Sequence, residues 1–205
     1  MLSCLLLGLV LLQPGTTPAR LKEASAALAA NDIRKAELIL EKALKEDPKS
    51  AEAHHLLGAI RLMERRFPEA ESHLKKALEL NPKLIAGHIA LADLRNDQNR
   101  RDDAAAILKK ALQIDPKDPR LLMRLGTAEA QAGRIAESLK YLEAVPEADA
   151  TPGYWEIRGR TYISAGRFNE AEQAYLRLLK HEPGSIATLR VLSGIALKLG
   201  DTAKA

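Results

Sequence analysis

The side chains that most often bind metals or act as nucleophiles are sparse in this 205-residue chain. Cys4 is the one cysteine, so neither an internal disulfide nor a cysteine-based metal site can form. The five histidines are His54, His55, His73, His88 and His181. No two of them stand four residues apart on a helix beside a carboxylate, as the HExxH zinc motif requires. We therefore expect no metal site and no cofactor.

Catalytic motifs are also missing from the sequence. It contains no Gly-rich phosphate loop and no GxSxG nucleophile motif. Carboxylates such as Glu69 and Glu71 fall on the outward faces of expected helices. We interpret them as solvated side chains rather than catalytic groups. We therefore expect no catalytic residues and no enzyme activity in these 205 residues.

The charge pattern argues against a nucleic-acid site. Thirty-one Lys and Arg residues face 27 Asp and Glu residues, giving a net charge of +4. Basic pairs such as Lys75-Lys76, Arg100-Arg101 and Lys109-Lys110 could form a basic stripe. Because charges of both signs alternate along the chain, these pairs indicate solvated helix faces rather than a basic stripe.

A ten-residue phrase recurs at a fixed spacing and indicates the elements that position these side chains. Residues 40–49 read LEKALKEDPK, residues 74–83 read LKKALELNPK and residues 108–117 read LKKALQIDPK, a period of 34 residues. The chain is 46% hydrophobic but only 3% aromatic, and its Ala- and Leu-rich, charged composition is typical of helices. The sequence predicts a stack of helical repeats.

Small residues keep fixed offsets from the prolines that end each phrase. Alanines stand five and twelve residues before them, and Ala or Gly stands 24 before. The clearest set is Gly58, Ala70 and Ala77 before Pro82. Seven residues make two turns, so Ala70 and Ala77 share one face of one helix, while Gly58 lies on the preceding helix. Each unit is therefore predicted to be a helical hairpin with closely packed backbones.

Turn residues mark the breaks between the paired helices. Equivalent positions hold Asn31, Arg65, Asn99, Gly133, Gly166 and Gly200. Gly and Asn favour the left-handed conformation that ends a helix, so we expect the first helix of each pair to end there. Arg65 departs from this pattern and predicts a strained or differently closed turn.

This pattern resembles the tetratricopeptide repeat family. The clearest matches are His54, Leu57-Gly58, Ala70, Leu74, Ala77 and Pro82 in one unit, and Trp155, Gly159, Tyr162, Ala171, Tyr175 and Pro183 in another. The resemblance implies an all-α, right-handed α-solenoid of helix-turn-helix units, about five and a half repeats. The array would fill residues 20–205, with units near 17–50, 51–84, 85–118, 119–151, 152–185 and a partial one at 186–205.

The fourth unit departs from the pattern. Pro146 stands about one turn before the expected proline, within the stretch AVPEADATPGYW of residues 144–155. We expect the second helix of this unit to be short and to stop near Val145. Two interpretations stay open: a tolerated irregularity, or a hinge or partner contact.

The two ends of the chain carry their own expectations. Residues 1–19 include an apolar run from Leu5 to Leu12, too short for a transmembrane span of ~20 residues but consistent with a signal peptide. Export to the periplasm, the medium or a membrane surface follows if this leader is cleaved; otherwise the protein is cytoplasmic. The sixth unit stops inside its second helix, so we expect further repeats or a docking partner to cover Leu189, Leu192, Ile195, Ala196 and Leu199.

The resemblance implies a function in protein interaction. First helices of such arrays line a concave groove that holds a peptide or a partner segment. The candidate groove residues are His55, Ala59, Leu62, Ile89, Asp93, Asn96, Met123, Thr127, Glu156 and Arg160. None of the pairs four apart among them joins a Lys to an Asn, so the chaperone-tail binding of some family members is not expected. The alternative is a substrate-recruiting arm of a larger enzyme whose catalytic domain lies beyond the C-terminus.

Overall fold

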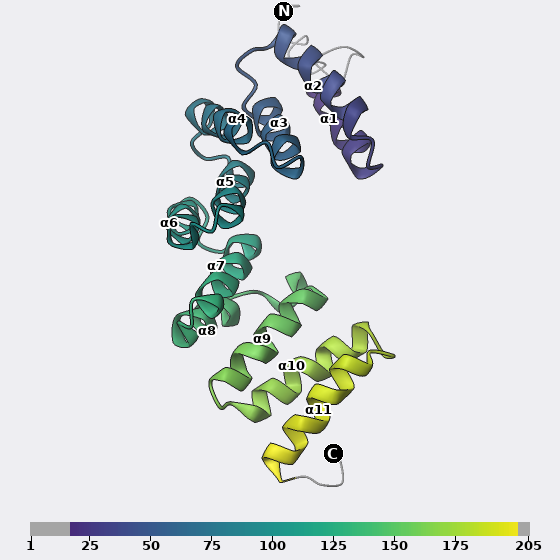
Figure 1. Cartoon of the computed structure of the whole chain (residues 1–205), viewed down its shortest axis with the longest axis vertical. Coiled ribbons are helices and arrows are strands. Elements are labelled where there is room, and N and C mark those ends of the chain that lie inside the picture. The colour runs from purple at the N-terminus through teal and green to yellow at the C-terminus, as the bar shows by residue number, and fades with distance from the viewer. Residues whose placement is uncertain (1–16, 201–205) are drawn as a thin grey trace, which may run out of the picture. The chain divides into compact units, whose positions relative to one another are not determined.

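The computed structural model describes residues 17–200 of the chain. This part is built from eleven α-helices and one short 3-10 helix, without a strand (Figure 1). Their bounds are α1 Thr17–Ala29, α2 Ile33–Glu46, α3 Ala51–Met63, α4 Phe67–Leu80, α5 Ile85–Asp97, α6 Arg101–Leu112, α7 Pro119–Gln131, α8 Ile135–Glu143, η1 Glu147–Asp149, α9 Pro152–Ser164, α10 Phe168–His181 and α11 Ile186–Leu199. The predicted all-α class is confirmed. Within residues 17–200, every helix is too short or too polar to cross a bilayer.

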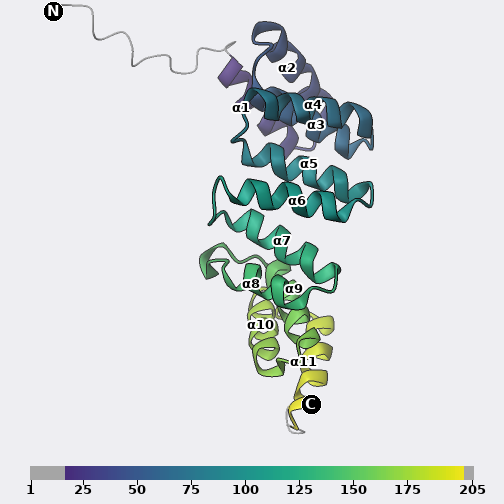
Figure 2. The same ribbon diagram turned by 90° about the vertical axis from the view of Figure 1, so that its left-hand side faces the viewer.

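Successive helices pair as antiparallel hairpins. The most extensive contacts join α1 to α2, α3 to α4, α7 to α8 and α9 to α10. Figure 2 shows the same pairing of α9 with α10 from a second direction. Several first helices begin at a residue whose side chain accepts a hydrogen bond from a backbone N–H, as Ser50 does from Ala53 at 3.3 Å and Thr151 from Tyr154 at 3.2 Å. Such caps satisfy donors that the first helical turn leaves unpaired.

The turns inside the hairpins have the backbone conformation that the sequence predicts. Positive φ angles occur at Asn31, Arg65, Asn99, Gly133, Gly166 and Gly200. Arg65, at φ 59°, closes its turn with the same backbone bonds as the asparagines, its N–H donating to the carbonyl of Leu62 at 2.9 Å. Of the two alternatives for this turn, the strained one is therefore found, because a side chain in this region is crowded by its own backbone.

The described chain forms two compact units, one reaching to Ile107 and the other starting at Leu108. Two clusters of buried side chains lie among the described residues of the N-terminal unit. Ala36, Leu40 and Leu57 belong to the cluster that joins α1, α2 and α3. Leu74 and Leu94 belong to the cluster that joins α4 and α5. Small alanines within these clusters allow the close helix packing that the repeat pattern predicts.

A larger core among the described residues of the C-terminal unit contains most of the aromatic residues of the chain. Its buried members include Leu142, Tyr154, Trp155, Tyr162 and Tyr175. Here too small residues set the helix spacing: a Cβ added to Gly126 of α7 would lie 2.5 Å from Cγ of Leu142 on α8. This separation is far below van der Waals contact, so only glycine fits at position 126 without a shift of Leu142.

Ion pairs join neighbouring hairpins within the N-terminal unit. Arg61 of α3 pairs with Glu37 of α2. Thirty-four residues later, Arg95 of α5 pairs with Glu71 of α4, with Nη2 2.7 Å from Oε1. In both cases an arginine near the end of a first helix binds a glutamate of the preceding second helix, 24 residues earlier.

The same place in the C-terminal unit carries the opposite charge. Glu129 of α7, a further 34 residues after Arg95, is fully buried and forms an ion pair with Lys109 on α6, with Oε1 2.8 Å from Nζ. Its second oxygen pairs with Arg134. Burial alone would raise the pKa of Glu129, but the hydrogen bonds from Lys109 and Arg134 outweigh burial and hold this pKa below its ordinary value.

Two irregular places match their predictions to different degrees. The second helix of the fourth unit, α8, ends at Glu143 after 9 residues, against 14 in α2, α4 and α10, so the short helix is confirmed. The expectation that five apolar residues of the last helix, α11, are left half covered is wrong for two of them. Leu189 and Leu199 are exposed, but Ile195 and Ala196 are already buried by the packing of α11 on α10.

Candidate binding site

The first group of predicted groove residues lies on α3 in the N-terminal unit. His55 and Ala59 are half-buried, and Leu62 packs against the cluster around Leu74. Burial lowers the pKa of His55 below its ordinary value, and the nearby carboxylate of Glu52 opposes this only in part. At neutral pH, α3 therefore presents an uncharged and partly apolar surface here.

The second group lies on α5, which contacts α3 directly. Ile89 is only 9% exposed, Asp93 is half-buried and Asn96 is exposed. The structure thus brings the α3 and α5 groups into one region of the N-terminal unit, in which Asp93 and Asn96 supply the accessible polar atoms.

The third group lies on α7 in the C-terminal unit. Met123 is half-buried and packs against the large core cluster. The Thr127 hydroxyl donates a hydrogen bond to the Met123 backbone carbonyl at 2.8 Å, so its polar atom is bound within its own helix. Both residues reach the surface in part, but each also serves the packing of α7.

The fourth group, on α9, is the most exposed. The side chains of Glu156 and Arg160 are 54% and 67% exposed, and Arg160 Nη1 lies 3.8 Å from Glu156 Oε1. Both residues line a cleft of about 530 Å³ between α9, α10 and α11. Other residues of its wall include Ile163, Tyr175, Leu178, Ser185, Thr188 and Val191. We call this hollow the α9–α11 cleft.

The sequence of α9 and α10 explains how the wall of the cleft is built. A Cβ added to Gly159 would lie 2.7 Å from Cε2 of Tyr175, so glycine at this position lets the Tyr175 ring pack against α9. Burial raises the pKa of the Tyr175 phenol, which therefore stays neutral at physiological pH. On the opposite side, the Thr188 hydroxyl donates to the Ser185 hydroxyl at 3.0 Å at the start of α11.

The α9–α11 cleft combines apolar walls with a charged rim. Such an arrangement suits a peptide segment, since apolar side chains can be buried in the hollow while Glu156, Arg160 and Glu182 contact polar groups. Sequence reasoning missed the α10 and α11 members of the wall, because it considered the first helices one at a time. The equivalence of α11 with α9 as first helices could have added α11 to the wall, but the positions equivalent to Glu156 and Arg160 are Arg190 and Gly194 rather than Thr188 and Val191.

The histidines offer one arrangement that the sequence did not suggest. His54 of α3 and His73 of α4 approach with their Nδ1 atoms 3.1 Å apart, and His54 Nε2 lies 3.3 Å from the carbonyl oxygen of Pro48. At that distance the two rings share one proton in a hydrogen bond. Among the residues that the structure describes, no three metal-ligating side chains form a group.

Known protein families share this architecture of helical hairpins. A family model described as "Tetratricopeptide repeat" matches residues 96–161, and a second model with the same description matches residues 21–85 and 158–205. The search of curated proteins by sequence gives no match.

Solved structures resemble the chain over most of its length. The structure of pilF from Pseudomonas aeruginosa has a TM-score of 0.81 at 23% identity, covering 92% of this chain and 86% of that one. PilW, described as a type IV pilus biogenesis factor, has a TM-score of 0.76 at 22% identity, covering 92% and 88%. YrrB, described as having an unusual peptide-binding site, has a TM-score of 0.62 at 20% identity, covering 84% and 89%. At these identities the likeness shows the fold, an α-solenoid of helical hairpins.

Proposed function

The chain belongs to the tetratricopeptide repeat family, and from this premise we propose that it is a scaffold that binds a peptide or partner segment along its first helices. The α9–α11 cleft is the observation that carries the proposal. It is a hollow of about 530 Å³ whose rim includes two of the sequence-predicted groove residues, Glu156 and Arg160. A cleft of this size holds a few side chains of an extended segment.

The distribution of repeated and unrepeated residues supports the same function. Positions that serve packing, such as Leu74 and Leu142, are buried and belong to the recurring pattern. Equivalent positions of the first helices hold His55, Ile89, Met123 and Glu156, all of different types. Because specificity requires side chains that differ from one repeat to the next, we assign partner recognition to these helices.

A peptide selection on the full chain tests the proposal. Peptides selected from a random displayed library would be measured by calorimetry against the native chain and the charge-reversal variants Glu156→Arg and Arg160→Glu. We expect each reversal to weaken the selected peptides at least ten-fold. Lys110→Glu, an exposed change on α6, is the matched control. If the selected peptides bind all four chains equally, the groove assignment is wrong.

We also propose export, on the apolar run of the predicted leader. Residues 1–16 lie outside the described residues, so the argument depends on the sequence alone. Fusing residues 1–20 to a reporter that is active only outside the cytoplasm provides the test. Reporter activity with the native run, lost when Leu6 and Leu7 are changed to Asp, is the expected result, and an inactive native fusion would exclude a signal peptide.

A further inference from the structure

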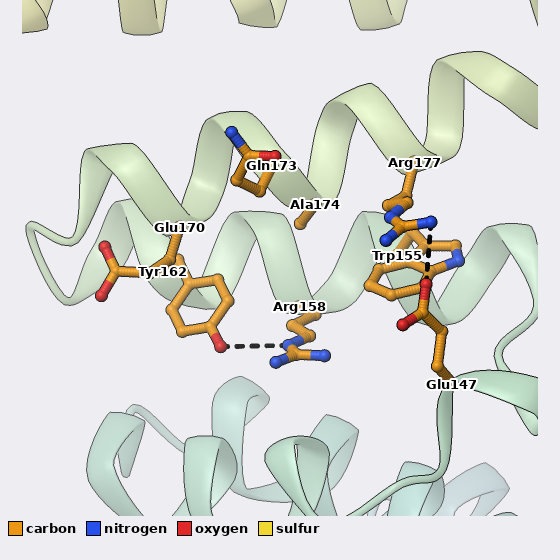
Figure 3. A pocket seen from close by; sticks show the side chains of 8 residues that line it. All are labelled: Glu147, Trp155, Arg158, Tyr162, Glu170, Gln173, Ala174 and Arg177. Atoms are coloured by element: carbon orange, nitrogen blue, oxygen red, sulfur yellow. Dashed lines mark hydrogen bonds and ion pairs between the residues drawn. The ribbon is translucent and has the colours of Figure 1, made fainter.

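A second hollow of the C-terminal unit lies on another face of α9. Its volume is about 250 Å³, and α9, α10 and η1 form its walls (Figure 3). From α9 come Trp155, Arg158 and Tyr162, which are spaced three and four residues apart and so share one face of the helix. Glu156 and Arg160, on the rim of the α9–α11 cleft, lie on a different face. We call this second hollow the Arg158 pocket.

The short α8 explains why η1 rather than a helical turn forms one wall of the Arg158 pocket. α8 ends at Glu143, about one turn early, and the chain continues through Pro146 into η1. From η1, the Glu147 side chain extends toward Arg177 of α10, with its Oε1 2.9 Å from Arg177 Nη1 (Figure 3). The pocket is therefore specific to the irregular fourth repeat.

Arg158 is the unusual charge in this pocket. Its half-buried guanidinium donates from Nη1 to the Tyr154 hydroxyl at 2.6 Å and from Nε to the Tyr162 hydroxyl at 3.0 Å. The same guanidinium lies 5.4 to 5.7 Å from the ring centres of Tyr154, Trp155 and Tyr162. Within residues 17–200, all these partners are neutral, and no carboxylate pairs with Arg158 directly.

The neighbouring carboxylates are already paired with other cations. Glu147 pairs with Arg177, and Glu170 accepts from Arg167 Nε at 2.7 Å. Glu143 accepts from the Tyr162 hydroxyl at 3.0 Å and also from Arg167 Nη1 at 2.9 Å, so the charge of Arg158 reaches it only through a phenol. The lining of the pocket thus carries one positive charge that lacks a direct anionic partner. A half-buried cation of this kind binds a carboxylate more strongly than an exposed one does.

The surroundings favour a peptide over a free anion as the source of that carboxylate. A further hollow on α10 shares Gln173 and Arg177 with the Arg158 pocket. Its other walls include Leu176, whose side chain belongs to the exposed large hydrophobic residues, and Leu179. An extended chain crossing Gln173 and Arg177 would contact the charged pocket with one residue and this apolar surface with a later one.

We propose that the Arg158 pocket binds the acidic side chain of an extended peptide whose following residues include an apolar one that packs on Leu176 and Leu179. The guanidinium of Arg158 supplies the charge, the rings of Trp155 and Tyr162 exclude water around the ion pair, and the exposed Gln173 amide lies at the mouth to bind the peptide backbone.

Trp155 gives a direct readout, because it is the one tryptophan of the chain and forms part of the pocket wall. Its fluorescence would be followed while the full chain is titrated with the capped peptide acetyl-Ala-Glu-Ala-Leu-Ala-amide. The matched probe replaces Glu by Gln. We expect a saturable change with the Glu peptide and an affinity at least ten-fold weaker for the Gln peptide.

Variants connect the signal to the pocket. Arg158→Gln should abolish the preference for Glu over Gln, while Arg158→Lys should keep part of it. Gln173→Glu and Gln173→Lys change only an exposed side chain, so they test the pocket even if an Arg158 variant fails to fold; the first should weaken and the second strengthen the Glu peptide several-fold. Arg190→Gln, an exposed change on α11, serves as the control.

The results separate the proposal from its rivals. Equal binding of the Glu and Gln peptides, or no change of Trp155 fluorescence with either, overturns the acidic-peptide site. A response to acetate alone that matches the response to the Glu peptide also overturns it, since the apolar contact would then contribute nothing. The scaffold function proposed for the α9–α11 cleft would survive each of these results, because Glu156 and Arg160 lie outside this pocket.

Discussion

Arg95 of α5 and Glu71 of α4 form a two-point ion pair, with Nη1 2.9 Å from Oε2 and Nη2 2.7 Å from Oε1. The Arg95 side chain is 9% exposed and the Glu71 side chain 26%. Bonds from Arg95 first, and then from Lys75, lower the pKa of Glu71 to about 2. This pair joins two successive hairpins, so its protonation state bears on the stability of the N-terminal unit.

The Glu71 pair predicts a loss of stability in acid. Because the pKa of Glu71 is lower in the folded chain, its contribution is complete above its ordinary value of 4.5 and disappears as the pH falls toward 2. The contribution is at most about 3.5 kcal/mol, at ~1.4 kcal/mol per pKa unit. Urea unfolding of the native chain and Glu71→Gln should differ at pH 6 and converge near pH 2. Glu79→Gln, an exposed change on the same helix, should have nearly the stability of the native chain at both pH values.

Removing the buried charge of Glu129 is predicted to lower the free energy of unfolding substantially. Glu129→Gln removes the charge that Lys109 and Arg134 share inside the C-terminal unit, and we expect a loss of about 1–3 kcal/mol in the free energy of unfolding. Glu137→Gln, on the exposed face of α8, should change stability by less than about 0.5 kcal/mol. Equal urea midpoints for the two variants would contradict the role of this buried pair.

Two glycine variants with opposite expected effects on stability test the close contact between α7 and α8. Gly126→Ala places a Cβ 2.5 Å from Leu142 Cγ, and we expect a cost of about 1–3 kcal/mol. Gly194→Ala, inside α11, meets nothing within 4 Å, so it should stabilise the chain by about 0.5–1 kcal/mol through helix propensity. Thermal unfolding followed by circular dichroism measures both; a stabilising Gly126→Ala would show that α7 and α8 are less close than described.

Tyr154 predicts how the short α8 is kept in place. Its hydroxyl donates to the carbonyl oxygen of Leu142 at 2.9 Å, in the last turn of α8, and accepts from Arg158. Tyr154→Phe removes both bonds and should cost about 1–2 kcal/mol. In Tyr141→Phe no hydroxyl bond to residues 17–200 is lost, so a much smaller change is expected in the same urea titration.

The exposed ion pair of Glu156 and Arg160 on α9 is predicted to contribute little to stability. Arg160→Glu removes a 3.8 Å contact between two side chains that are more than half exposed, so stability should change by less than about 0.5 kcal/mol. Met123→Asp, in contrast, puts a charge against the core cluster and should cost about 2 kcal/mol or more. Arg160→Glu is therefore the better probe of binding, and a measured unfolding free energy for both variants checks this choice.

The hairpins, their turns and the small residues between them were predictable because each depends on local and periodic features. Gly133 and Asn99 mark the turns by their backbone preference alone, and the 34-residue period places Ala70 and Ala77 on one face. The early proline at position 146 predicted the short α8 for the same reason.

Side-chain partners across repeats were less predictable. Glu129 and Lys109 are 20 residues apart on different helices, and no local rule shows that a Glu at this position will be buried and paired. The Arg158 pocket likewise depends on the space left where α8 ends, on rotamers and on three aromatic rings meeting at one guanidinium. Patterns of residue type indicate which faces pack together but do not fix such details.

The reversal of charge at Glu129 limits how such a gene could change length. Arrays gain or lose units when recombination joins equivalent points of two repeats. Removing residues 85–118, one full period, would bring Glu129 into the place of Arg95. Glu71 would lose its arginine and would share Lys75, the equivalent of Lys109, with Glu129. Two carboxylates would then confront each other at a joint between hairpins. Units that share a backbone pattern are thus not interchangeable, because the charge at this position must match the charges on the preceding helix.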